Sequence, residues 1–485
     1  MREPLWRRAL RSGSATLVLA QLARLTVQIT ALIVLSQVLP PAAFGLVAMV
    51  TAVAGIATVI GDFGLSLAAL TGGPLDQNQR SKLFLTNAAV GFFLTGAVAA
   101  SGPALVAFYG RDELAAIAAG ISPIFLLNAL AVQFKVELNL RSRWARLALT
   151  ETAGPVLGLA CAIPVAAVTH SYWALVMQPV IASAVQLVLA VGLAAWHPSR
   201  TNRSSSISTH LRFGRDTLGL QAFTYVSSNT DNAVVGRSMG EDVLGEYSRA
   251  YQLAMMPVTQ LASPLTRVML PRLRDARDVE SFNATGAALQ RILCYSLFAP
   301  LTFLIATARP LTELALGENW SAVPPLLQIL SLGSMFVAAA YVYYWMYLAR
   351  QATKVLALTE GIARLAMVGA VIAAGAKGPL WVAWRVTGGQ VLLMVASSVV
   401  GWRVLQFDVP RLLKGALGPT LALGSGAVAG VWAQGWTSDS SSLESLALCA
   451  LAWIVASTAV ATAVTPIRSD LTGYARAATS FVRDR

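Results

Sequence analysis

The stretch DNAVVGRSMGEDVLGEYSRAYQLAMMP (residues 231–257) is polar and charged, and long apolar runs lie on both sides of it. The chain has 485 residues, of which 56% are hydrophobic and only 12% are charged. A soluble globular protein has roughly 25% charged residues, so this composition indicates a membrane protein. The polar stretch is then predicted to hold a turn between two membrane-spanning helices.

Apolar runs of roughly 20 residues, each long enough to cross the hydrocarbon core as a helix, recur along the chain. We therefore predict an all-α integral membrane protein with about fourteen transmembrane helices. The predicted spans are residues 16–38, 44–70, 83–109, 114–136, 147–169, 172–196, 216–238, 243–270, 288–308, 322–348, 355–375, 380–402, 415–434 and 445–466.

The distribution of positive charge predicts the orientation of these spans. Cytoplasmic loops of membrane proteins are enriched in Lys and Arg. With the N-terminus inside, most of the 36 Lys and Arg fall on the cytoplasmic side, whereas the outside loops hold only Arg111, Arg309 and Lys377. The sequence therefore predicts a multi-pass membrane protein with both termini in the cytoplasm. The net charge of +13 follows from this topology and from contact with membrane lipids, and no folded basic domain suggests nucleic-acid binding.

An internal repeat predicts how the spans are grouped. An offset of 200 residues places VLSQVLPPAAFG (residues 34–45) over VVGRSMGEDVLG (residues 234–245), so that Gly45 meets Gly245. Each stretch is the predicted outside turn between the first two spans of its half. We expect two six-helix lobes related by a pseudo-two-fold axis along the membrane normal, followed by two further helices. The predicted divisions are 1–196 for the N-terminal lobe, 197–215 for a cytoplasmic linker, 216–402 for the C-terminal lobe and 403–485 for two additional spans and a cytoplasmic tail.

Two stretches resemble a known family. FGRDTLGLQAFTYVSSNTDNAVVGRSMGEDVLGEYSRAYQLAMMPVTQLASPLTRVMLPRL (residues 213–273) combines a polar Asn/Asp span, a Gly-Arg turn, Leu-Gly-x-Tyr and a Met-Pro run. LPPAAFGLVAMV (residues 39–50) with GDFGLSLAAL (residues 61–70) is similar to the first-half counterpart. Together they resemble the oligosaccharide-flippase branch of the multidrug, oligosaccharidyl-lipid and polysaccharide exporters. The resemblance implies transfer of an undecaprenyl-diphosphate-linked oligosaccharide from the inner to the outer leaflet by alternating access, with polysaccharide polymerase machinery as a further partner.

Cations deep inside a span are the first candidates for binding such a cargo, because a charged side chain at the bilayer centre is costly and a diphosphate would offset it. Arg24 lies roughly 12 Å into the first predicted span. Gln21, Arg24 and Gln28 follow the spacing of one helix face. This stripe is predicted to line a cationic central cavity, and a packing bond to a neighbouring helix is the alternative.

The seventh and eighth predicted spans carry a second polar group. Tyr225, Asn229 and Asn232 form a stripe beside Asp231, and we expect it to line the same cavity. Arg249 is a candidate for head-group binding, with a local pair to Glu246 as the alternative. Arg267 is a further candidate for substrate binding, and the alternative is that its side chain reaches water at the inner boundary. Asp62 and Asp231 are candidates for coupling transport to an ion, and a hydrogen bond to a helix end is the alternative for Asp62. The aromatic run YVYYWMYLA (residues 341–349) is predicted to lie at the inner membrane interface, with sugar stacking as the alternative.

The sequence holds no catalytic, cofactor or metal motif: HExxH, a Gly-Lys-Ser/Thr phosphate loop and paired cysteines are all missing. We therefore predict a transporter with no enzymatic activity and no cofactor. Two alternatives stay open. A cation-coupled drug antiporter of the same superfamily would favour an acidic cavity. A membrane-bound polysaccharide polymerase or glycosyltransferase would need a larger charged outer loop.

Overall fold

A computed structural model describes residues 13–62, 76–199, 208–375, 377–436, 441–465 and 467–468. Every regular element in these ranges is a helix, which confirms the predicted all-α class. The helices are long because a chain inside hydrocarbon must satisfy its backbone hydrogen bonds within each segment. Within the part of the chain that the structure describes, twelve candidate spans are apolar and long enough to cross a membrane, and helix α11 (Ser208–Arg274) is not among them. The predicted number of about fourteen spans is thus an approximate count.

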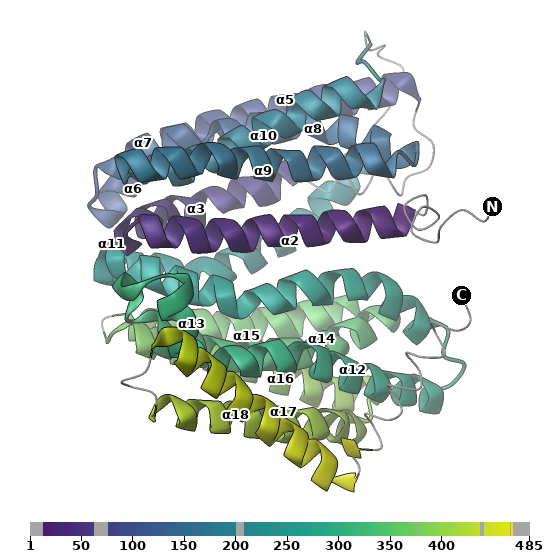
Figure 1. Cartoon of the computed structure of the whole chain (residues 1–485). Helices are drawn as coiled ribbons and strands as arrows, with labels where there is room; N and C mark the ends of the chain where they lie inside the picture. The colour runs from purple at the N-terminus through teal and green to yellow at the C-terminus, as the bar shows by residue number, and fades with distance from the viewer. Residues whose placement is uncertain are drawn as a thin grey trace, which may run out of the picture. The chain divides into compact units, whose positions relative to one another are not determined.

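The chain forms two compact units, and it passes from one to the other between Gly245 and Glu246. The predicted domain limits at 196, 215 and 402 do not coincide with this point and stay predictions. Helices of the first unit are α2 (Gly13–Val38), α3 (Pro41–Asp62), α5 (Gln77–Ala100), α6 (Gly102–Tyr109), α7 (Glu113–Ile121), α8 (Pro123–Leu140), α9 (Trp144–Thr169), α10 (Trp173–Ala194) and the first part of α11 (Ser208–Arg274) (Figure 1).

Two predicted spans of the first unit consist of two helices each. Residues 83–109 fall on α5 and α6, which join at Ser101, and residues 114–136 fall on α7 and α8, which join at Ser122. A proline stands at the first or second position of both α6 and α8. Proline lacks a backbone N–H, so it is tolerated in the first turn of a helix but interrupts a helix interior. The breaks in these spans therefore have a local cause.

Helix α11 contains the predicted seventh and eighth spans. Its helical backbone is interrupted at Gly240, which has φ 86° and ψ −177°. Residues with a side chain rarely adopt this left-handed φ, whereas glycine adopts it at no steric cost. The turn predicted from the polar stretch at 231–257 is therefore a change of direction at one glycine.

The second unit contains the rest of α11 and the helices that follow it. They are α12 (Val279–Ala306), α13 (Ala308–Ala315), the 3-10 helix η1 (Glu318–Trp320), α14 (Val323–Ala349), α15 (Thr353–Ala374), α16 (Pro379–Leu405), α17 (Val409–Gln434) and α18 (Ser442–Ala463) (Figure 1). Helices α17 and α18, the predicted additional pair, pack against each other, and α17 also packs along α12. Large apolar side chains of α18, such as Leu451 and Val455, are exposed, as expected of a helix that faces lipid.

The aromatic run at residues 341–349 lies in the core of the second unit. Tyr343, Trp345 and Tyr347 are buried there. The indole N–H of Trp345 donates to Thr266 Oγ1 at 2.8 Å, and the hydroxyl of Tyr347 donates to the carbonyl oxygen of Ser397 at 3.0 Å. For these three side chains the expectations of a membrane-interface belt and of a sugar-stacking surface are both wrong, because all three side chains are packed inside the core.

The three cysteines make no disulfide. Cys294 and Cys449 are buried in the second unit, and Cys161 is exposed on α9.

Candidate functional site

Arg24 on α2 is held by two side chains. Its Nη1 atom donates to Glu151 Oε2 at 2.6 Å, and its Nη2 atom donates to Gln21 Oε1 at 2.5 Å. Glu151 lies on α9, which packs along α2. The structure thus brings Gln21 and Arg24 together, whereas Gln28 lies further along α2 and is exposed. The charge of Arg24 is balanced by a carboxylate in the same unit.

Glu151 is a site residue that the sequence reasoning missed. The signal was present, because Glu151 is an acidic residue near the start of the apolar run at 147–169. The pair is accessible: the side chain of Arg24 is 37% exposed and that of Glu151 is 27% exposed. Charged groups in contact with hydrocarbon are strongly disfavoured, so a polar surface is the favourable surrounding for this pair.

The polar stripe on the first part of α11 bonds largely within its own helix. Asn229 Nδ2 donates to the carbonyl oxygen of Tyr225 at 2.9 Å, and Asn232 Nδ2 donates to Asn229 Oδ1 at 3.4 Å. The Asp231 side chain is only 4% exposed, and its Oδ1 accepts from the backbone N–H of Asn232 at 2.9 Å. The Tyr225 hydroxyl reaches out of the helix and donates to the carbonyl oxygen of Thr51 on α3 at 2.8 Å. The stripe therefore tethers α11 to α3.

Arg249 belongs to the second unit. Its Nη1 atom donates to Gln252 Oε1 at 2.6 Å, one turn further along α11. Glu246, the alternative local partner, accepts at Oε1 from the backbone N–H of Ala322 at 3.4 Å. Arg24 and Arg249 thus lie in different units, and their joint action on one cargo stays a prediction.

Two further candidates have side chains outside the described part of the structure: Asp62, at the end of α3, and Arg267, within α11. Their predicted roles are not addressed by the structure. Among the described residues, no group of three or more His, Cys, Asp or Glu side chains is placed to hold a metal ion.

A close backbone contact joins α3 to α11 near the Gly240 break. A Cβ atom added to Gly45 would overlap the carbonyl oxygen of Glu241, and one added to Gly245 would overlap the carbonyl oxygen of Pro41. Beside this contact, Arg111 Nη2 pairs with Glu241 Oε2 at 2.7 Å. Only glycine permits so close an approach of two backbones. The contact is predicted to lie at the outside ends of these spans.

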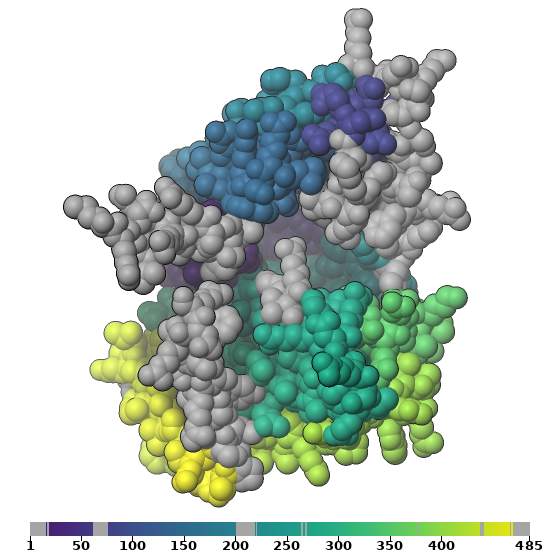
Figure 2. All heavy atoms as spheres, turned by 90° about the vertical axis from the view of Figure 1, so that its right-hand side faces the viewer, coloured from purple at the N-terminus to yellow at the C-terminus, as the bar shows by residue number. Residues whose placement is uncertain are grey.

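A second ion-pair cluster lies at the opposite, predicted cytoplasmic ends of the first unit's helices. The buried carboxylate of Glu137 pairs with Arg80 at 2.7 Å and with Arg141. Figure 2 shows the start of α5 and the α8–α9 region on the same face of the unit. This cluster joins the ends of α5 and α8.

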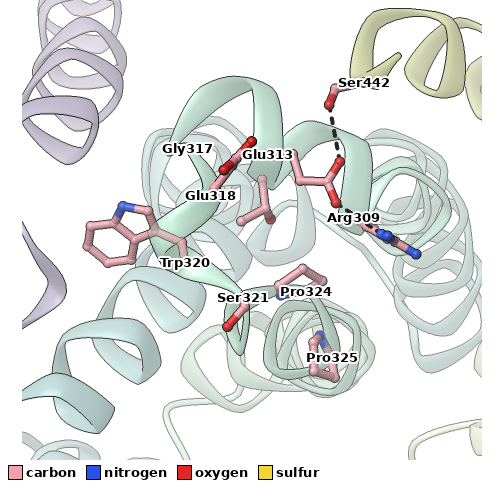
Figure 3. Close-up of a pocket in the computed structure, with 10 residues that line it drawn as sticks. Arg309, Glu313, Gly317, Glu318, Trp320, Ser321, Pro324, Pro325 and Ser442 are labelled. Atoms are coloured by element: carbon pink, nitrogen blue, oxygen red, sulfur yellow. Dashed lines mark hydrogen bonds and ion pairs between the residues drawn. The ribbon is translucent and has the colours of Figure 1, made fainter. Parts of the chain in front are cut away.

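The second unit contains a cavity of about 640 Å³ beside α13, η1 and the start of α14. Glu313 lies between Arg309 and Ser442 in this cavity (Figure 3): Glu313 Oε1 accepts from Arg309 Nε at 2.9 Å, and Oε2 accepts from the Ser442 hydroxyl at 3.1 Å. The indole of Trp320 points away from these three side chains. Arg309 and Glu313 are thus already paired with each other, and the cavity contains none of the predicted site residues.

Solved structures with a similar fold are transport proteins. The structure of the lipid II flippase MurJ in an inward closed conformation matches with a TM-score of 0.71 and 13% sequence identity, over 93% of this chain and 98% of that one. An inward-facing multidrug resistance MATE family transporter of the MOP superfamily matches with a TM-score of 0.59 and 16% identity, over 81% of this chain and 99% of that one. The fold is therefore that of a multi-pass helical transporter.

Sequence comparison assigns the family. The model of the family described as "Polysaccharide biosynthesis protein" matches residues 34–325. The chain belongs to this family, because the match covers more than half of its length. This result confirms the resemblance that the two stretches at 39–70 and 213–273 indicated.

Curated relatives are involved in bacterial polysaccharide biosynthesis. The lipopolysaccharide biosynthesis protein WzxC of Escherichia coli (strain K12) is 23% identical over 304 residues, 61% of each protein. The succinoglycan biosynthesis transport protein ExoT of Rhizobium meliloti (strain 1021) is 23% identical over 398 residues, 79% of this chain and 77% of ExoT. The chain thus matches about three fifths of the length of WzxC. Transport and flipping are the activities named among these relatives and neighbours.

Proposed function

We propose that this protein flips an undecaprenyl-diphosphate-linked oligosaccharide from the inner to the outer leaflet of a bacterial inner membrane, for the synthesis of a surface polysaccharide. The family supports a cargo of polysaccharide biosynthesis, and the fold supports transport. Flipping proceeds by alternating access, with Arg24 and Arg249 binding the diphosphate in a cationic cavity. Both termini are proposed to be cytoplasmic.

The physical task explains why such a protein keeps charges inside its spans. A diphosphate and the hydroxyl groups of a sugar cannot enter hydrocarbon without a large loss of hydration free energy. A polar path through the protein removes this barrier for the head group, while the polyprenyl chain stays in lipid. Arginine suits this path because its planar guanidinium donates two parallel hydrogen bonds to a phosphate group.

The observation that carries the proposal is the position of Arg24. It lies within a membrane-spanning helix, it is partly exposed, and Gln21 and Glu151 hold its guanidinium in place. An arginine that is both accessible and already oriented loses less side-chain entropy when it binds an anion. The family match favours a lipid-linked sugar over a drug as the cargo.

The proposal can be tested by complementation. Arg24→Ala and Arg249→Ala are expressed in a bacterium that lacks its own flippase for a given surface polysaccharide, and export is measured with the level of lipid-linked precursor. We expect both variants to lower export at least tenfold and to accumulate precursor, because each removes a cation from the path. Arg385→Ala is the matched control, since Arg385 is an exposed arginine near the start of α16.

Membrane insertion of each variant is checked by its amount in purified membranes. Export at the wild-type level from well-inserted Arg24→Ala and Arg249→Ala variants would reject the assignment of the diphosphate site. Equal loss in the Arg385→Ala control would show that the effect is not specific to these two arginines.

A further inference from the structure

The ion pair between Arg24 and Glu151 differs from the other ion pairs that the structure describes in the first unit. The pair between Arg111 and Glu241 lies beside the predicted outside turn, and the pairs of Glu137 lie at the predicted cytoplasmic ends of helices. Arg24 and Glu151 instead meet inside the spans, roughly 10 Å along α9 from its start. The two residues join α2 to α9 and are 127 positions apart in sequence.

Both members of this pair remain accessible. With side chains 37% and 27% exposed, the guanidinium has donors that an anionic ligand can reach without unpacking α2 from α9. By contrast, the carboxylate of Glu137 is 2% exposed, so no ligand can replace it without disturbing the fold. An anionic ligand can therefore replace Glu151 as the partner of Arg24 more easily than it could replace Glu137.

An arginine without a partner inside a membrane protein is unfavourable, and so is a dianionic cargo without a cation. Removing one partner from a desolvated ion pair is costly because it leaves the other charge unbalanced. A protein that repeatedly binds and releases an anion thus gains from a resident carboxylate that balances the arginine whenever the cargo is absent. Glu151 lies at the position that this role requires, with its Oε2 atom 2.6 Å from Arg24 Nη1.

We propose that Glu151 is an exchangeable counterion, which occupies Arg24 in the empty transporter, gives way to the diphosphate of the cargo, and promotes release when it returns. This inference rests on the proposed function and adds a residue that sets how tightly and how long the cargo is held. Gln21 keeps its bond to the other nitrogen, Nη2, and so orients the guanidinium while Nη1 changes partner.

A purely structural role for Glu151, as a pin between α2 and α9, leads to a different expectation. Loss of a pin lowers the stability of the unit, and binding and transport then fall together. Loss of a competing counterion raises affinity for a diphosphate, while it slows release and hence export. Binding and export therefore change in opposite directions only if the carboxylate is exchangeable.

The test uses the full-length protein in lipid nanodiscs and farnesyl diphosphate as the probe. Glu151→Gln keeps the shape of the side chain and removes its charge. We expect it to bind the probe about fivefold more tightly than wild type, and to export polysaccharide several times more slowly in cells. Glu360→Gln is the matched control. Glu360 also lies within a span and pairs with an arginine, with its Oε2 atom 3.7 Å from Arg364 Nη2. We expect the Glu360→Gln variant to bind the probe as tightly as wild type does.

Glu151→Asp provides a second variant if Glu151→Gln inserts poorly. It keeps the charge but shortens the reach toward Arg24 by one methylene group, so its affinity is expected to lie between those of wild type and Glu151→Gln. Unchanged or weaker probe binding in both Glu151 variants would overturn the inference.

Arg24→Gln separates this inference from the proposed function. If Arg24→Gln abolishes probe binding while both Glu151 variants bind as wild type does, the diphosphate site stands and the counterion role is wrong. If Arg24→Gln binds the probe as tightly as wild type, the diphosphate site at Arg24 is itself wrong, and the counterion role is lost with it.

Discussion

Gly45 on α3 lies directly against the carbonyl oxygen of Glu241, with no room for a side chain between them. Gly245 lies against the carbonyl oxygen of Pro41 in the same way. The internal repeat with an offset of 200 residues matches Pro41 with Glu241 and Gly45 with Gly245. The contact of Gly45 with Glu241 therefore corresponds to the contact of Gly245 with Pro41. Such an exchange of partners is the property of contacts at a two-fold axis. All four residues of these contacts lie in the first unit.

Alanine at either glycine should destabilise the protein. Gly45→Ala and Gly245→Ala each place a methyl group onto a backbone carbonyl, and overpacking of this kind costs about 1–3 kcal/mol. We expect a clearly lower melting temperature for both variants of the detergent-solubilised protein. Gly96→Ala is the control, because nothing lies within 4 Å of its added Cβ atom. A melting temperature of the Gly45 and Gly245 variants equal to that of the control would contradict the contact.

Tyr225→Phe should loosen the tether between α11 and α3. The substitution removes the hydrogen bond from the Tyr225 hydroxyl to the carbonyl oxygen of Thr51 and leaves the ring in place, so we expect a loss of about 0.5–1.5 kcal/mol in unfolding free energy. Thermal melting followed by size-exclusion chromatography measures it. Tyr172→Phe serves as the comparison, since Tyr172 makes no hydroxyl hydrogen bond with the described residues. Equal effects of both substitutions would argue against the tether.

Glu137→Gln should destabilise the predicted cytoplasmic end of the first unit. The substitution leaves Arg80 and Arg141 without their shared carboxylate. Losing one partner of a buried pair costs roughly 3–5 kcal/mol, and we expect about 2 kcal/mol here because both arginines are partly exposed. Limited proteolysis of the α8–α9 region reports the change. Glu280→Gln, which breaks an exposed pair with Arg411, should have little effect, and a similar effect of the two substitutions would refute the prediction.

The start of α12 should show a dependence on pH. Asp278 caps this helix, and the hydrogen bond that its carboxylate accepts from the backbone N–H of Ser281 lowers the pKa of Asp278 below its usual value. A carboxyl with a lowered folded-state pKa stabilises the fold above its unfolded pKa, near 3.9 for aspartate, and this stabilisation is lost as the pH falls through the folded-state value.

Asp278→Asn retains an acceptor oxygen but has no charge to lose. The melting-temperature difference between wild type and Asp278→Asn should therefore shrink between about pH 6 and pH 3. A difference that is constant across this range would show that the charge of Asp278 does not contribute.

The membrane-spanning helices could be predicted from the sequence because the hydrocarbon core imposes both a length and an apolar composition. A turn between the predicted spans at 216–238 and 243–270 also followed from the polar stretch, and the structure places it at Gly240. The interruptions at Ser101 and Ser122 were missed, because the residues on both sides of each break are apolar. Hydropathy averaged along the chain therefore stays high across the break.

The candidate site was predictable only in part. The spacing of Gln21 and Arg24 placed them on one face, and the structure joins them by a hydrogen bond. Their partner Glu151 lies 127 residues from Arg24 in the chain, and helical periodicity carries no information about which distant helix packs alongside. The aromatic side chains at 343, 345 and 347 were misassigned for a related reason, since aromatic residues are common both at membrane interfaces and in packed cores.

The unequal exposure of the three cysteines makes this chain convenient for spectroscopy. Modification of a thiol requires access to the sulfur atom, and only Cys161 is exposed. Replacing this one residue with serine should leave a protein that maleimide reagents barely label. Pairs of cysteines placed afterwards at chosen positions could then carry spin labels, and the distances between those labels would follow the two units through a transport cycle.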